Sequence, residues 1–213
     1  MKYYSQFGED KFLYEKHLNY KNGFFIELGA MDGITFSNTK FFEDELGWNG
    51  ILIEPVINQF EKLIINRSEC CNFHCVVSET NGDVDFIGNG AIGGVLSTMS
   101  ETHKKNFDLY PERGHSPNKI KSLPFYKIIK DINIKRVDLF SIDVEGGEYE
   151  VLNTFDWDIP VYLILIELDG NDKNKDEKCR KFLIEKGFEF DSKIGPIEKP
   201  DLSEIWINNK NKL

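Results

Sequence analysis

Short apolar runs of strand length alternate along the chain with segments in which apolar residues recur at helical spacing. The apolar runs are nearly continuous, which is typical of parallel strands covered on both faces. They span residues 23–28, 50–55, 72–79, 83–88, 137–144 and 161–168. The helical patterns span residues 38–46, 57–67, 124–134, 147–155 and 176–188, and the runs 188–194 and 203–209 form a closing strand pair. This order predicts a doubly wound α/β fold with a Rossmann-like sheet, mostly parallel with one antiparallel strand near the C-terminus.

Residues 89–123 interrupt this alternation with a stretch rich in Gly, Ser, Thr, His and Pro. A connection of that length without secondary structure is uncommon and is usually functional. The length of 213 residues, with 40% hydrophobic and 29% charged residues, suits a single globular domain. We therefore expect residues 1–213 to form one domain, complete or cut from a longer chain, in which residues 89–123 are an irregular insertion.

The charge balance argues against several classes of partner. The formal net charge is −10, whereas binding to nucleic acid or to an anionic membrane needs clustered Lys and Arg. No apolar run approaches the roughly 20 residues that span a bilayer, and no signal-peptide pattern opens the sequence. The four cysteines lack the spacing of a disulfide framework. We expect a cytoplasmic protein with reduced thiols and without nucleic-acid or membrane-spanning contacts.

Carboxylates stand at most ends of the predicted parallel strands, where an open α/β sheet binds its ligands. They are Glu27, Glu54, Asp143, Glu145, Glu167 and Asp169. Several carboxylates at one edge of a sheet repel one another unless a cationic or hydroxyl-rich ligand binds there. Helix capping would explain single members of this set and remains open as an alternative for them.

The turn after the first strand, ELGAMDG at residues 27–33, is rich in small residues but is neither G-x-G-x-x-G nor a Walker loop. Its acidic Glu27 and Asp32 would repel a pyrophosphate and would suit a cationic amino-acid tail. Glu54, which ends the second strand, is the acid expected on a ribose diol. An amino-acid tail joined to a ribose indicates S-adenosylmethionine more than NAD.

Five segments carry motifs of a known family. They are YSQFGEDKFL (4–13), FIELGAMDGITFSNT (25–39), GILIEP (50–55), VVSETNGDVDF (76–86) and VDLFSIDVEGGEYEVL (137–152). In this order they resemble the FkbM-type methyltransferases, which are class I, S-adenosylmethionine-dependent O-methyltransferases. The resemblance runs from Tyr4 to about Asp169 and departs from the general class I pattern at Met31, where a second glycine is common. It implies a class I methyltransferase sheet, with substrate choice in the unmatched insertion 89–123.

The resemblance also implies which residues hold the cofactor. They are Gln6, Glu27, Gly29, Ala30, Asp32, Gly33, Ser37, Asn38, Glu54, Pro55, Val77, Ser78 and Asp143. The glycine turn wraps the methionine part, and Ser37 and Asn38, which open a helix, are placed for its carboxylate. Glu54 takes the ribose hydroxyls, residues 77–78 flank the adenine, and an N-terminal helix with Gln6 covers the cofactor.

Methylation of a hydroxyl needs groups that align it and take its proton. Asp143 and Glu145, in the motif DVEGGE, are the first candidates for this catalytic role, and Glu167 is the next. A divalent cation such as Mg²⁺ or Mn²⁺, bound by Asp143, Glu167 and Asp169, is an open alternative because hard cations take carboxylate oxygens. His103, in the insertion, is a further candidate base.

The acceptor is the part of the function that the residues determine least. Many FkbM-type enzymes modify saccharides, so the resemblance implies a sugar hydroxyl of a glycan or glycoconjugate, for example a deoxyhexose such as rhamnose. Phe107, Tyr110 and Phe125 are candidates for stacking on a sugar face, and His115 is a second loop histidine that could act as a base. O-methylation of a small-molecule natural product, a NAD-dependent oxidoreductase and a non-catalytic binding module remain alternatives.

Overall fold

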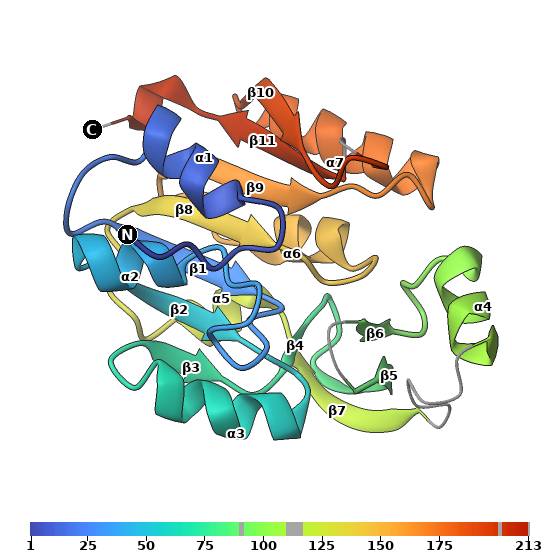
Figure 1. The fold of residues 1–213 in the computed structure, drawn as a ribbon. Coiled ribbons are helices and arrows are strands. Elements are labelled where there is room, and N and C mark those ends of the chain that lie inside the picture. Colours follow the sequence, from blue (N-terminus) through green and yellow to red (C-terminus); the bar gives the residue numbers. More distant parts are fainter. Residues whose placement is uncertain (90–91, 110–116, 200–201, 213) are drawn as a thin grey trace.

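The computed structural model describes residues 1–89, 92–109, 117–199 and 202–212, and a seven-stranded sheet runs through its centre (Figure 1). In spatial order its strands are β10, β11, β9, β8, β1, β2 and β3. Their bounds are β1 Phe24–Leu28, β2 Asn49–Ile53, β3 Cys71–Phe73, β8 Val137–Ile142, β9 Val161–Glu167, β10 Glu189–Ile194 and β11 Ser203–Ile207. β11 pairs antiparallel with β9 and β10, and the other neighbours pair in parallel. The predicted sheet with one antiparallel strand near the C-terminus is confirmed.

Helices cover both faces of this sheet (Figure 1). Their bounds are α1 Glu9–Lys16, α2 Lys40–Leu46, α3 Ile57–Asn66, α5 Phe125–Ile129, α6 Glu148–Thr154 and α7 Lys173–Glu185. Successive residues of a strand serve opposite layers, because Ile26 packs in the core with α5, α6 and α7, whereas Phe25 packs with α1, α2 and α3. Burial on both faces explains the continuous apolar runs of the sequence. Within the described residues, no helix is long and apolar enough to cross a membrane.

β1 lies where the order of the strands reverses. The chain leaves β1 for β2 and β3 on one side and later returns to β8 on the other side. This reversal opens a crevice beyond the carboxyl ends of β1 and β8, the usual ligand site of such a sheet. Gly29, directly after β1, has a φ of +75°, and a Cβ there would lie 2.2 Å from the carbonyl oxygen of Asp143. Only glycine lets the two strand ends approach this closely.

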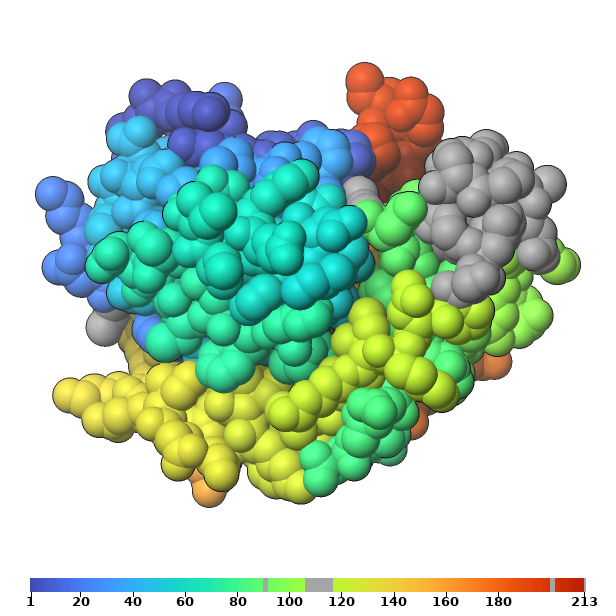
Figure 2. Space-filling model, turned by 90° about the horizontal axis from the view of Figure 1, so that it is seen from below, coloured from blue at the N-terminus to red at the C-terminus, as the bar shows by residue number. Residues whose placement is uncertain are grey.

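Residues 89–123 are not the irregular insertion that the sequence predicts. They contribute β6 Gly93–Val95, helix α4 Glu101–Leu109 and β7 Asn118–Leu123, and these two strands join β4 Val76–Val77 and β5 Gly82–Gly88 in a second sheet ordered β4, β7, β5, β6. The predicted strand 72–79 is thereby divided between the two sheets as β3 and β4. Because exposed lysines alternate with covered residues along β7, its apolar signal is weak. Figure 2 shows β7 at the surface of the molecule next to the region of β3 and α3.

Candidate functional site

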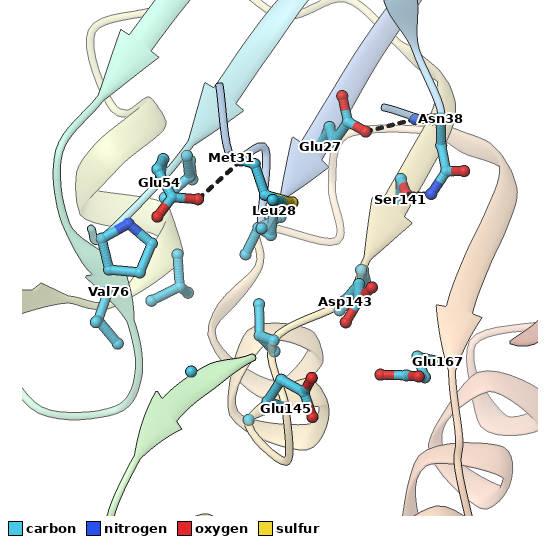
Figure 3. Close-up of a pocket in the computed structure, with 18 of the residues that line it drawn as sticks. Glu27, Leu28, Met31, Asn38, Glu54, Val76, Ser141, Asp143, Glu145 and Glu167 are labelled. Carbon is cyan, nitrogen blue, oxygen red and sulfur yellow. Dashed lines mark hydrogen bonds between the residues drawn. The ribbon is translucent and has the colours of Figure 1, made fainter. Parts of the chain in front are cut away.

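A cavity of about 130 Å³ opens beyond the carboxyl ends of the central strands (Figure 3). Its lining includes the predicted residues Gln6, Glu27, Gly29, Asn38, Glu54, Pro55, Val77, Ser78, Asp143, Glu145 and Glu167. The N-terminal segment closes one side with Phe7 and Glu9, and the second sheet contributes Phe86 and Val95. The cavity therefore lies at the edge of the sheet where the topology predicts a ligand.

Glu27, at the end of β1, is buried, and protein groups engage its carboxylate. It accepts hydrogen bonds from the Ser37 hydroxyl (2.9 Å), the Asn38 backbone N–H (2.7 Å) and the Thr39 hydroxyl (2.6 Å). Burial raises the pKa of Glu27, and the Arg67 guanidinium, 3.9 Å away, opposes that rise. Glu27 thus fastens the segment 37–39 to the end of β1 and leaves little of its charge for a ligand.

Arg67, which follows α3, is a completely buried cation that sequence reasoning missed. Its guanidinium donates to the Gly33 carbonyl (3.0 Å), the Ser37 hydroxyl (3.2 Å) and the Thr39 hydroxyl (3.0 Å). It also forms an ion pair with Glu43. The Arg67 cluster consists of Arg67, Glu27, Ser37, Thr39 and Glu43. An arginine at the end of a helix usually needs no partner beyond the helix dipole, so the sequence carried no signal for this cluster.

Four of the predicted cofactor ligands do not line the cavity. They are Ala30, Asp32, Gly33 and Ser37. The Asp32 carboxylate stabilises its own turn, because it accepts from the backbone N–H groups of Ile34 (2.9 Å) and Thr35 (2.7 Å). The Ser37 hydroxyl is buried within the Arg67 cluster, and a Cβ at Gly33 would lie 2.6 Å from the Arg67 side chain. Asp32 and Ser37 thus have partners within the protein, and their contacts with a cofactor stay a prediction.

Glu54 follows β2 and faces the cavity opposite the end of β8 (Figure 3). Its Oε2 accepts from the Met31 backbone N–H (2.8 Å), and its Oε1 accepts from the Val56 backbone N–H (2.7 Å). Each carboxylate oxygen keeps a second lone pair for a ligand. Burial raises the pKa of Glu54 to about 7. A carboxylate fixed in this way can accept from two neighbouring hydroxyls.

Three carboxylates meet on the other side of the cavity (Figure 3). Asp143 and Glu145 follow β8, Glu167 ends β9, and one oxygen of each lies within 4.8 Å of the others. We call these three residues the carboxylate cluster. Asp143 is exposed, but the space that it faces is the cavity, and protein surrounds it on its other sides. The sequence predicted this convergence, since all three residues lie at the ends of two neighbouring parallel strands.

Limited hydration and mutual repulsion hold protons on the carboxylate cluster. Burial raises the pKa of Asp143, and burial together with the Asp143 charge raises that of Glu145 to about 8. Burial, the neighbouring charges and a hydrogen bond with Asp143 raise the pKa of Glu167 well above its ordinary value. Asp143 and Glu167 share a hydrogen bond, which needs a proton on one of the two carboxyls. The cluster is therefore partly protonated near neutral pH. A cationic ligand would favour the loss of those protons.

His103, on α4, adjoins the carboxylate cluster. Its Nε2 lies 3.0 Å from the Asp169 carboxylate, and its Nδ1 lies 3.4 Å from Glu145. The hydrogen bond with Asp169 raises the pKa of His103. Asp169 lines a smaller adjoining cavity and is held by His103, so the oxygens close enough to share a cation belong to Asp143, Glu145 and Glu167. The predicted metal ligand Asp169 is thus replaced by Glu145 in this geometry.

Of the aromatic side chains predicted to stack on a sugar, the structure describes that of Phe125 alone. Phe125 is completely buried in the main core, so its predicted role is wrong. The Phe107 side chain, Tyr110 and His115 lie outside the residues that the structure describes. Phe36 instead lines the cavity and is 43% exposed. Sequence reasoning missed it because it treated Phe36 only as part of the motif around Ser37.

Backbone strain also marks the cavity. Among the described residues other than glycine, Asn22, Met31, Phe36 and Glu145 have positive φ. The last three of these line the cavity. Side chains rarely tolerate this conformation, and residues that adopt it concentrate at functional sites.

Comparison with known proteins agrees with the sheet topology. A family model described as the methyltransferase FkbM domain matches residues 27–190. The crystal structure of the methyltransferase FkbM from Methylobacillus flagellatus KT superposes with a TM-score of 0.56 and 12% identity over 96% of this chain, which spans only 48% of that protein. Fibrillarin from Aeropyrum pernix, solved with natively bound S-adenosyl-L-methionine, superposes with a TM-score of 0.53 and 12% identity over 94% of this chain and 73% of its own. Among curated proteins none matches the sequence significantly. At these identities the structural likenesses show the fold, which is that of class I methyltransferases.

Proposed function

The chain belongs to the FkbM methyltransferase family, and from this premise we propose that it methylates a sugar hydroxyl of a glycan or glycoconjugate. Family membership makes it an S-adenosylmethionine-dependent methyltransferase and favours that cofactor over NAD. The O-methyl product and the sugar acceptor are the parts that we propose. The observation that carries them is the carboxylate cluster in the cavity, because three close carboxylates can orient a hydroxyl and accept its proton.

The residues that line the cavity fit S-adenosylmethionine. The free lone pairs of Glu54 suit the two ribose hydroxyls, and Val77 and Ser78 offer a wall for the adenine. Gln6 and Asn38 lie in the same lining as Gly29 and are our candidates for contacts to the amino-acid part. The carboxylate cluster supplies negative charge for a cationic cofactor.

The proposed reaction is a direct displacement. When bound, S-adenosylmethionine would supply a methyl carbon activated by its sulfonium, and its sulfur would keep the electron pair of the carbon–sulfur bond as the hydroxyl oxygen bonds to that carbon. The hydroxyl proton passes to an ionised oxygen of Asp143, Glu145 or Glu167. These residues also hold the acceptor in line, which is the larger part of catalysis at an already activated carbon. His103, held by Asp169, lies 3.4 Å from Glu145, and its protonated form favours the ionised state of that carboxylate.

A divalent cation is the second candidate occupant of the carboxylate cluster. Three oxygens within 4.8 Å of one another are enough to begin a site for Mg²⁺ or Mn²⁺. Such an ion would acidify an acceptor hydroxyl directly. Loss of activity on chelation, with recovery on addition of Mg²⁺ or Mn²⁺, would favour this alternative.

The domain organisation, the acceptor side and the cellular location are further parts of the proposal. We propose that residues 1–213 act as one methyltransferase domain whose acceptor side is built by residues 89–123. The exposed face of Phe36 suits a sugar ring or, as the alternative acceptor, a small-molecule natural product. The free cysteines and the acidic net charge support a cytoplasmic enzyme that does not act on nucleic acid.

The test is methyl transfer from labelled S-adenosylmethionine to a panel of methyl-free glycans, glycosides and natural-product alcohols, with and without chelator. We expect label in an ether of at least one saccharide, and loss of that label in Glu167→Gln. The matched control is Glu61→Gln, an exposed carboxylate on α3 that lies outside the cavity. Label found only in natural-product alcohols would contradict the sugar assignment, and label on carbon or nitrogen would contradict O-methylation.

A further inference from the structure

The cavity has a one-sided charge. Seven Asp and Glu side chains belong to its lining, whereas the described part of the lining contains no Lys, Arg or His. The protein itself already compensates some of these charges, through an ion pair or hydrogen bonds. Glu27 belongs to the Arg67 cluster, Glu54 accepts two backbone N–H groups, and Glu9 accepts the Phe7 backbone N–H (2.8 Å). The protein compensates the charge of the remaining carboxylates, Asp143, Glu145, Glu150 and Glu167, least.

The carboxylate cluster has little compensating charge. Among the residues that the structure describes, His103 is the one cationic side chain within 4.0 Å of it, and His103 is shared with Asp169. Lys175, in the smaller adjoining cavity, donates instead to the carbonyls of Thr98 (2.6 Å) and Gly146. A further lining residue, Glu150, has a buried Oε2 with no hydrogen-bond partner among the described residues. The cavity thus offers more acceptors of positive charge than the protein itself uses.

The cofactor alone does not balance this excess. S-adenosylmethionine carries a single net positive charge at neutral pH, because its ammonium and sulfonium are offset by one carboxylate. Glu145 and Glu167 line both the main cavity and the smaller one, so carboxylates continue into the adjoining space, where we place the acceptor. The carboxylates would attract an ammonium group there, and they would repel a carboxylate or phosphate.

We propose that the acceptor bears an amino group near its reacting hydroxyl, as in an amino sugar, and that the cavity excludes acceptors with acidic groups. This inference rests on the proposed function, since it names the acceptor class of the same site. Glu145 and Glu167 are its specificity-determining residues. The transfer itself is unchanged, with the methyl group moving to oxygen and the hydroxyl proton to a cluster carboxylate, while the neighbouring ammonium stays protonated and unmethylated.

The test compares three matched sets of methyl hexosides with gluco, galacto and manno configuration, in amino, neutral and uronic acid forms. Binding is measured by saturation-transfer NMR and calorimetry on protein loaded with S-adenosylhomocysteine, and methyl transfer is measured separately with S-adenosylmethionine. All runs contain chelator. We expect the best amino hexoside to bind about tenfold more tightly than its neutral match, and the uronic acid to bind at least about tenfold more weakly, as one partly shielded charge predicts.

Two variants assign the effect to its residues. Glu145→Gln should reduce the preference for the amino form and relieve the exclusion of the uronic acid, whereas the control Glu61→Gln, the same substitution at an exposed position outside the cavity, should alter neither. Because Gln keeps the size of Glu, we expect the variant to stay folded, and a melting curve verifies it. Rates are reported as kcat and KM for each acceptor, so that a loss of binding is separated from a loss of turnover.

The outcomes separate this inference from the proposed function. If the hexosides bind in the predicted order, the inference is supported. If none of them is methylated, the sugar assignment is overturned. Methylation with equal or better use of uronic acids would overturn the inference and leave the O-methyltransferase intact. Absence of binding by all three sets would overturn both. A repeat with Mg²⁺ in which uronic acids become the best ligands would also overturn it, because the cluster then holds a metal that attracts anions.

Discussion

The Arg67 cluster and the carboxylate cluster both gather acidic side chains at the ends of neighbouring parallel strands, but the protein completes only one of them. In the Arg67 cluster, each oxygen of Glu27 has a donor, and a buried guanidinium balances the charge. In the carboxylate cluster, Asp143, Glu145 and Glu167 face one another. Among the described residues, His103 is the one cationic side chain within 4.0 Å of them.

This difference teaches which strand-end carboxylates are structural and which await a ligand. A buried charge with its partners in place fixes the backbone and costs stability when either partner is removed. A group of charges without partners costs stability as it stands and is retained for what it binds. The following experiments test that distinction.

Removal of the cation should break the Arg67 cluster. Arg67→Met leaves Glu27 and Glu43 buried without their counter-ion, so we expect the free energy of unfolding to fall by about 3–5 kcal/mol. Urea denaturation measures it, with Lys62→Met, which removes an exposed cation of α3, the helix that Arg67 follows, as the control. A loss below about 1 kcal/mol would show that the cluster is not the structural member of the pair.

Glu54 tests whether a carboxylate with free lone pairs serves a ligand. Glu54→Gln keeps one acceptor for the backbone but loses the charge offered to the ribose hydroxyls, so S-adenosylmethionine should bind about 10- to 100-fold more weakly. Calorimetry measures the affinity, and the melting temperature is expected to change little. An unchanged affinity combined with a lower melting temperature would place Glu54 with the structural carboxylates.

The pH dependence of stability reports the carboxylates whose pKa is raised in the folded protein. Burial raises the pKa of Glu148 to about 7, and burial with the Asp143 charge raises that of Glu145 to about 8, from an ordinary value of 4.5. The folded state therefore binds protons more tightly than the unfolded state, and stability falls as pH rises through that interval. We expect the ligand-free protein to lose several kcal/mol, on the order of 5, between pH 5 and pH 9.

The same titration has an internal check. Glu148→Gln removes one of the groups with a raised pKa, so the loss of stability with rising pH should become smaller. S-adenosylmethionine should also reduce it, because a cation stabilises the ionised cluster. Stability that rises steadily from pH 5 to pH 9 would contradict the assignment of these carboxylates as uncompensated.

Within the carboxylate cluster, loss of a charge should stabilise the protein. Glu167→Gln relieves repulsion with Asp143 and Glu145, so at pH 8 we expect the free energy of unfolding to rise by about 1 kcal/mol while methyl transfer falls. Parallel measurements of unfolding and of transfer give both effects. Destabilisation by several kcal/mol would show that the carboxylate cluster, like the Arg67 cluster, stabilises the fold.

The substitution of Asp32 has the smallest expected effect, and it tests whether this carboxylate is structural or binds the cofactor. Its carboxylate serves only the turn at Ile34 and Thr35, so Asp32→Ala should cost about 0.5–1 kcal/mol of stability. The affinity for S-adenosylmethionine should stay within about twofold. A large loss of affinity without loss of stability would restore the cofactor role that its sequence position predicted.

The main sheet could be predicted because buried parallel strands leave an unmistakable apolar pattern, as in residues 161–168. The carboxylate cluster could be predicted for a related reason, since parallel strands bring their last residues to one edge. The internal partners of Asp32 and Ser37 could not be predicted, because sequence position does not reveal which groups of the protein a polar side chain contacts. Arg67 was missed because its partners come from residues far away in the sequence, which only the folded chain brings together.

The second sheet was missed for a different reason. β7 is short, half-exposed and interrupted by lysines, and its pairing with β4 and β5 joins segments separated by long stretches of chain. Such non-local pairing leaves no periodic signal. His103 could be recognised only as a polar residue of an insertion, because its contact with Asp169 depends on where α4 lies.

The pairing of β7 with β4 has a consequence for how this enzyme could change over evolutionary time. Val77 and Ser78, in the wall proposed for adenine, are joined to β7 by strand pairing and by a 2.6 Å hydrogen bond between the Ser78 and Ser122 hydroxyls. β7 is also the strand by which the insertion returns to the main domain. An exchange of the insertion for one with a new acceptor preference would therefore disturb the cofactor wall. New specificities should arise more readily by substitutions on α4 and β6 than by replacement of the whole segment.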